Sequence, residues 1–119
     1  MTVVLYSFDE ELSSVSTNEW TDKLVVSGEV TEGQYKLFAS CEFAGDTVGK
    51  IIAVRILLDN EEVSACSTLV AVPGMPQKFC DMGLATLTEG EHSMVLQYRS
   101  ETLPNTTFIR RARILVEKH

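Results

Sequence analysis

The sequence has little of the chemistry that enzymes and metal sites require. Its two histidines are His92 and the terminal His119. Its three cysteines are an odd number without a Cys-x-x-Cys pair, which argues against a disulfide framework and against a zinc site. Neither a Ser-His-Asp arrangement nor a glycine-rich phosphate loop can be assigned. We therefore expect a protein that is not an enzyme and carries no cofactor or metal ion.

Long apolar runs are also lacking. No stretch approaches the about 20 apolar residues that a membrane-spanning helix needs. The N-terminal residues include no base, and acidic residues follow at positions 9 to 11, which is unlike a secretory signal. We therefore expect synthesis in the cytoplasm and no membrane partner.

Basic residues are scarce and unevenly placed. The chain has 17 acidic and 10 basic residues and a net charge of -7. Residues 1–62 carry a net charge of -8, and residues 63–119 carry +1. This balance argues against nucleic-acid binding. Most of the acid is expected to be solvated surface; the alternative is that an acidic face of one subunit meets a basic strand of another, head to tail.

Two segments of the chain repeat one pattern. An aliphatic residue leads into Thr-Glu-Gly at residues 31–33 and again at residues 88–90, and an alternating segment follows each time. Glycine adopts the positive φ that such a reversal needs. The repeat predicts two related corners in a β-protein. Tyr35 and His92 hold the same place after each corner, so we expect a structural role for His92.

Alternation of apolar and polar residues predicts strands, and no helical period is sustained. Residues 35–43 have one apolar face, with Phe38 an exception on the polar face. Residues 50–58 are apolar on both faces, which suggests cover on both faces, including burial in an oligomer. A change of parity across Arg110 and Arg111 predicts a β-bulge. Further strands are expected over residues 3–7, 20–30, 78–87 and 107–117, and after residue 90.

Short strands at regular spacing predict an all-β fold, a single antiparallel β-sandwich of the jelly-roll-like kind. The sandwich is expected to span residues 1–119 as one domain, with a polar loop or arm around residues 8–18.

Six residues are candidates for an interface. Arg99, Arg110, Arg111 and Arg113 either pair with acids of their own chain or grip carboxylates of a neighbouring subunit. Phe38 and Arg55 complete this set, because both break the pattern of an otherwise regular strand face. An alternative site is an aromatic platform for sugar stacking built from Trp20, Phe38 and Tyr98, although aromatic residues of a sandwich are more often core.

Several short motifs resemble the small virion structural proteins of tailed phages. In residues 90–100, a Gly-x-His corner opens a strand that ends in Gln-Tyr-Arg-Ser, and residues 107–116 contain Ile-Arg-x-Ala-Arg. Residues 5–9, 20–24 and 33–35 resemble the opening strand, second strand and first corner of that family.

The resemblance implies a jelly-roll-like capsid decoration, or cement, protein that bridges capsomers. It implies a homotrimer whose partner is the major capsid protein, and a virion location after synthesis in the host cytoplasm. It brings no catalytic residues. The alternative function is a carbohydrate-binding module or a tail-associated module for host recognition.

Overall fold

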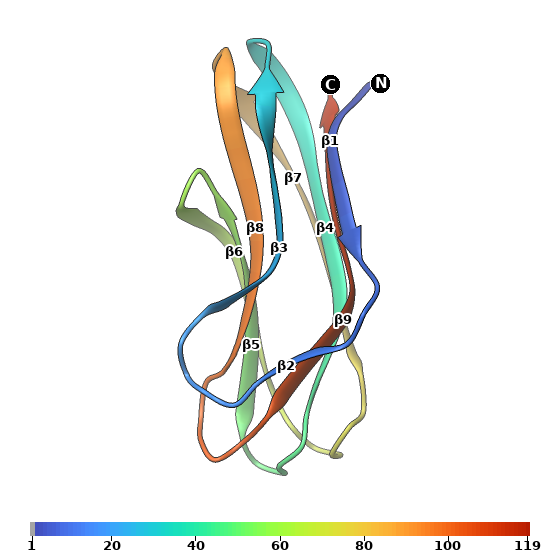
Figure 1. The fold of residues 1–119 in the computed structure, drawn as a ribbon, viewed down its shortest axis with the longest axis vertical. Coiled ribbons are helices and arrows are strands. Elements are labelled where there is room, and N and C mark those ends of the chain that lie inside the picture. Colours follow the sequence, from blue (N-terminus) through green and yellow to red (C-terminus); the bar gives the residue numbers. More distant parts are fainter. Residues whose placement is uncertain (1) are drawn as a thin grey trace.

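The computed structural model describes residues 2–119 and consists of nine strands joined by turns and loops (Figure 1). None of the described segments is a helix that could cross a membrane. The strands are β1 (Thr2–Asp9), β2 (Ser13–Val15), β3 (Thr21–Val30), β4 (Gly33–Gly45), β5 (Ile51–Leu58), β6 (Glu61–Leu69), β7 (Gln77–Leu87), β8 (Gly90–Ser100) and β9 (Thr107–Lys118).

The strands form two antiparallel sheets that face each other. The five-stranded sheet has the order β1-β9-β4-β7, with β2 paired to β9, and the four-stranded sheet has the order β3-β8-β5-β6. The sandwich is elongated, with extents of 45 × 21 × 20 Å. The predicted all-β, antiparallel and jelly-roll-like sandwich is thus confirmed.

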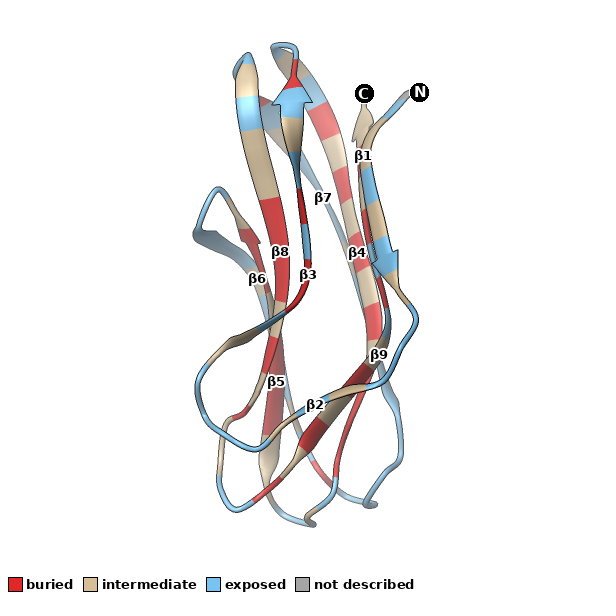
Figure 2. Cartoon of the chain, in the orientation of Figure 1, coloured by how far each residue is buried: buried red, intermediate tan, exposed pale blue. Residues whose placement is uncertain are grey.

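The core lies between the sheets and is filled by alternate residues of the central strands (Figure 2). In β4 the five residues of the predicted apolar face are all buried: Tyr35, Leu37, Ala39, Cys41 and Phe43. Met94, Leu96 and Tyr98 of β8 supply the opposite wall. Since side chains in a strand alternate between faces, this burial also fixes which residues point outward.

The two Thr-Glu-Gly corners lie side by side at one end of the sandwich. The first carries the chain from β3 to β4 and the second from β7 to β8, so each crosses between the sheets (Figure 1). Val30 pairs with Gly90 across one sheet, and Gly33 pairs with Leu87 across the other. The φ angles of 156° at Gly33 and 130° at Gly90 confirm the predicted need for glycine.

The ring that follows each corner makes the same hydrogen bond. The Tyr35 hydroxyl donates to the Thr31 carbonyl oxygen at 2.6 Å. The His92 Nε2 lies 2.8 Å from the Thr88 carbonyl oxygen, to which it donates. Each ring therefore ties its strand back to its corner, and the sequence repeat is also a structural repeat.

The segment around residues 8–18, expected to be a polar loop or arm, is mostly exposed and is held against the sandwich at two places. The strand β1 continues to Asp9, and β2 pairs with β9. The cause is Lys23, whose ammonium lies 3.1 Å from the Asp9 carboxylate and donates to the Glu11 carbonyl at 2.7 Å and the Ser13 hydroxyl at 2.8 Å. Its side chain is only 1% exposed. A buried ammonium requires such partners, so Lys23 holds the segment against the sandwich.

We predict that Lys23→Met lowers the free energy of unfolding by about 2–3 kcal/mol, because Asp9, Glu11 and Ser13 lose their shared partner. Breaking a fully buried ion pair costs about 3–5 kcal/mol, and Asp9 is partly exposed and regains water. Urea denaturation followed by tryptophan fluorescence measures the change. The matched control is Lys78→Met, which removes an exposed ammonium. Equal losses in the two variants would contradict the anchoring role.

Candidate functional site

The outer face of the five-stranded sheet carries an apolar row that crosses four strands. Tyr6 of β1 lies opposite Leu115 of β9, Leu115 lies opposite Phe38 of β4, and Phe38 lies opposite Met82 of β7. We call these four residues the outer row. Tyr6 is 50% and Met82 61% exposed. The Phe8 ring extends the row, with its centroid 5.7 Å from that of Tyr6.

Charged residues form a belt beside the outer row. The Glu42 carboxylate forms ion pairs with Arg110 at 3.4 Å and with Arg111 at 3.0 Å. Arg113 forms an ion pair with Glu10 at 2.8 Å. Lys78 is the residue opposite Glu42 on β7. We call these six residues the belt. Its four cations and two carboxylates make it a cationic zone in an acidic chain.

The belt shifts the acid–base properties of its members. Partial burial alone would raise the pKa of Glu42, but the charges of Arg111 and Arg110 lower the pKa below its ordinary value. The hydrogen bond to Glu10 raises the pKa of Arg113. Both pairs therefore remain ionised at neutral pH. Pairing within the chain, one of the two alternatives for these arginines, is present in the structure, and all three guanidinium side chains remain 41–59% exposed.

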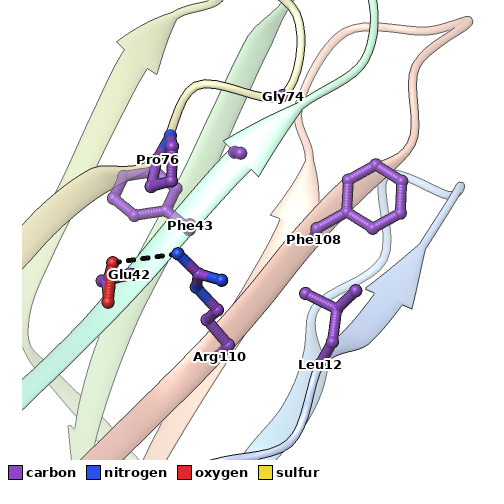
Figure 3. Close-up of a pocket in the computed structure, with 8 residues that line it drawn as sticks. Leu12, Glu42, Phe43, Gly74, Pro76, Phe108 and Arg110 are labelled. Atoms are coloured by element: carbon purple, nitrogen blue, oxygen red, sulfur yellow. Dashed lines mark hydrogen bonds and ion pairs between the residues drawn. The ribbon is translucent and has the colours of Figure 1, made fainter.

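An apolar pocket of about 530 Å³ lies on the other side of the belt (Figure 3). Figure 3 shows Phe108 and Leu12 on one side of it and Phe43 and Pro76 on the other, with Arg110 reaching across to Glu42. Ala44 and Gly74 complete the lining. The outer face is thus arranged along its strands as an apolar row, a charged belt and an apolar pocket.

The edge formed by β6 and β7 is a second apolar surface. Each of these strands pairs on one side only, so its other side lacks a neighbouring strand. A cavity of about 170 Å³ lies between the two strands, and Val63, Met82 and Leu84 line it while remaining largely exposed. Asp81 also lines it. Glu61 is the first residue of β6, and it lies opposite Leu58, which also lines the cavity. We call this surface the acidic edge; it comprises Glu61, Val63, Asp81, Met82 and Leu84.

On the four-stranded sheet, Trp20 comes directly before β3, and its ring contacts two arginines, Arg99 of β8 and Arg55 of β5. The guanidinium carbon of Arg55 lies 4.4 Å, and that of Arg99 4.3 Å, from the Trp20 ring centroid. Both distances fit cation–π contacts. Arg55 also donates to Gln97 at 2.7 Å, and Arg99 pairs with Glu101 at 3.2 Å.

The predicted interface residues do not form one surface. The structure brings together Phe38, Arg110, Arg111 and Arg113 on the outer face of the five-stranded sheet. Arg55 and Arg99 lie on the other sheet. Tyr6, Leu115 and Met82 were missed, because only the pairing of distant strands places them beside Phe38. A weak signal existed in the shared parity of Tyr6 and Phe8.

One alternative from the sequence is wrong, and one expectation is confirmed. The sugar platform is not assembled, since Tyr98 is a core residue with 2% exposure, and Trp20 and Phe38 belong to opposite sheets. The predicted cover on both faces of the apolar strand over residues 50–58 is confirmed, and neighbouring residues of the same chain supply it. Ala53 and Leu57, on its outward side, are already buried within one chain, where they lie opposite Arg99 and Val95.

Cys41 and His92, two side chains that could take part in chemistry, serve the fold instead. Burial raises the pKa of the Cys41 thiol to about 12. The His92 Nδ1 lies 2.6 Å from the Asp59 carboxylate, and Ser93 donates its backbone N–H to the same group at 2.9 Å. With Nε2 on the Thr88 carbonyl, both ring nitrogens serve as donors. Among residues 2–119, no group of three or more His, Cys, Asp or Glu side chains is placed to hold a metal ion.

No family model matches the sequence, and no curated protein matches it. Solved structures do share its fold. The chain is similar to the Eiger TNF of S. frugiperda at 12% identity and a TM-score of 0.66, covering 100% of this chain and 94% of that one. It is similar to a chain of infectious bursal disease virus, Gx strain, at 10% identity and a TM-score of 0.62, covering 98% and 32%.

A third similar structure is the CBM36-1 domain of a multidomain xylanase from the hindgut metagenome of Trinervitermes trinervoides. It has 6% identity and a TM-score of 0.53, and the match covers 92% of this chain and 95% of that domain. At these identities the comparisons establish the jelly-roll fold, which viral chains and carbohydrate-binding domains share.

We predict that the His92–Asp59 pair stabilises the fold most in mildly acidic solution. The bond to Asp59, then that to Thr88, raises the pKa of His92 above 6.5. Burial alone would raise the pKa of Asp59, but the bonds from His92 and Ser93 lower it below 3.8. The stability from His92 is therefore complete below pH 6.5 and lost as pH rises through its folded pKa. That from Asp59 is lost as pH falls below 3.8.

The measurement compares melting temperatures of the wild type and Asp59→Asn from pH 3 to pH 9. The excess stability of the wild type should be largest between about pH 4 and 6.5 and should shrink on both sides. Asp22→Asn, which alters a carboxylate bonded to Gln97 rather than to a histidine, is the control. A difference that stays constant with pH would show that the pair does not titrate as described.

Proposed function

We propose that this chain is a structural protein of a virion, and specifically a decoration protein that stabilises the head of a tailed phage. The outer face of the five-stranded sheet is the observation that carries the proposal. An exposed apolar row, a belt of arginines and an apolar pocket lie on one surface, and contiguous apolar area with arginine and aromatic residues is typical of protein contact sites.

A decoration protein acts by adding contact area across joints of the shell, and it needs no chemistry. A stable contact buries about 1,200–2,000 Å² in total, so the protein must present a preformed surface to its partners. The sandwich provides it, because β9 and β4 are paired on both sides and hold their outward side chains in register. A non-catalytic role also agrees with the engagement of His92 and the raised pKa of Cys41.

The proposed partners are other copies of the chain, in a homotrimer, and the major capsid protein. The proposed location is the virion, after synthesis in the host cytoplasm. Three observations support this choice among binding functions: the motif resemblance to small phage virion proteins, the shared fold with a virus chain, and the apolar outer row.

We predict that phage heads lacking this protein release their DNA at a lower temperature, and that added purified protein restores the wild-type temperature. Met82→Glu should fail to restore it, because a charge enters the outer row. A fluorescent DNA dye that reports release during heating measures the effect. Gold-labelled antibody on intact particles gives the location.

Val25→Glu is the matched control, since it places the same charge on an exposed apolar residue of the opposite sheet. It should restore the release temperature as the wild type does. Labelling confined to the tail, or heads whose release temperature does not depend on the protein, would overturn the decoration role.

The second candidate is a carbohydrate-binding or tail-associated recognition module. Trp20 favours it, because this partly exposed indole is accompanied by the guanidinium donors of Arg55 and Arg99. Rings beside hydrogen-bond donors suit sugars. A glycan array compares the wild type with Trp20→Ala. Under this candidate, the wild type binds a defined glycan class and the variant loses at least tenfold in affinity; no binding by the wild type removes the candidate.

A further inference from the structure

We infer that the belt and outer row of one copy receive the acidic edge of the next copy, so that the chain assembles head to tail into a closed ring. This inference rests on the self-association in the proposed function, and it names the two surfaces that meet. Both surfaces are accessible in the single chain, and each combines apolar side chains with a net charge, positive on the belt and negative on the edge.

The charges of the two surfaces favour this contact. Two arginines share Glu42, and the belt holds four cations against two carboxylates. On the acidic edge, Glu61 and Asp81 form no ion pair with any residue of the described chain. Each exposed guanidinium has donors left after one contact, since arginine carries five N–H groups. The edge therefore offers carboxylates that the belt can bind.

The positive charge of the belt disfavours the simplest alternative, a two-fold dimer formed by two outer faces. In such an interface the same patch meets itself, so belt would oppose belt. Like charges placed together across an interface oppose association. A contact between belt and edge joins opposite charges, and it is heterologous because the two surfaces differ.

The β7 edge of the described sheet is unpaired. The β7 strand is 11 residues long and exposes Met82 and Leu84 without a neighbouring strand on that side. Proteins normally cover or charge such an edge. Packing it onto the outer row of another copy covers both apolar surfaces in one contact.

The placement of the two surfaces favours a closed ring. A heterologous contact produces a ring when its rotation closes and a filament when it does not. Met82 belongs to both surfaces, because the outer row ends on the strand that forms the edge. Because the two contact surfaces adjoin on each copy, each copy is rotated by a large angle relative to the one before it. A large rotation closes a ring after few copies, and we expect a trimer.

The test is a charge exchange measured by sedimentation velocity. Reversing the belt with Arg111→Glu and Arg113→Glu, or the edge with Glu61→Lys and Asp81→Lys, should weaken association at least tenfold. The chain that carries all four substitutions should recover association, because opposite charges meet again. Leu84→Arg should weaken association through the apolar part of the edge, and Val25→Glu should not. Circular dichroism establishes that each variant is folded.

Recovery of association by the variant with all four substitutions supports the inference, since a face-to-face dimer would gain nothing from reversal of the charges on the edge. A monomeric wild type, or association that is insensitive to the edge substitutions, overturns it. The outcome is separable from the decoration role. If the protein forms rings that do not bind heads, this inference stands and the decoration role is wrong. If it is a monomer that coats heads, the decoration role stands and this inference is wrong.

Discussion

The position of β4 between β9 and β7 is the constraint on which the outer face depends. Its inward residues are locked in the core, where Tyr35 is fully buried and donates its hydroxyl to Thr31. A slip of one residue would turn every side chain of the strand to the other face and expose this apolar set. The core therefore fixes the register, and the register places Phe38 between Leu115 and Met82. Interior packing thus determines the composition of the exterior.

The sequence predicts whatever is local. Alternation in residues 35–43 identifies β4, the repeated Thr-Glu-Gly identifies both corners, and the parity change at Arg110 and Arg111 identifies the bulge. It does not predict which distant strands pair, because many registers satisfy the same pattern. Tyr6 and Met82 are 76 positions apart in the chain, and only pairing through β9 and β4 aligns them. Lys23 was missed for the same reason, since its partners come from the preceding segment only after β2 has docked.

The bulge at Arg111 gives the belt its chemistry. Successive residues of a regular strand point to opposite faces, so neighbouring arginines cannot both reach one carboxylate. At Arg111 the φ angle is 53°, and the pairing with β4 shifts between Ser40 and Glu42. An inserted residue of this kind redirects a side chain. Arg110 and Arg111 consequently both contact Glu42, and a feature of backbone geometry becomes a concentration of positive charge.

The concentration of positive charge on the belt favours one orientation of the copies in any assembly of this chain. A surface with only apolar residues pairs with many partners and with itself, whereas charge of one sign discourages contact between identical patches. The rest of this acidic chain offers carboxylates, and the β6–β7 edge sets Asp81 among exposed apolar residues. In the proposed assembly, apolar area supplies affinity, and the charges select the orientation in which copies meet. The proposed decoration role requires both, because an undirected apolar surface would aggregate before it reached its site.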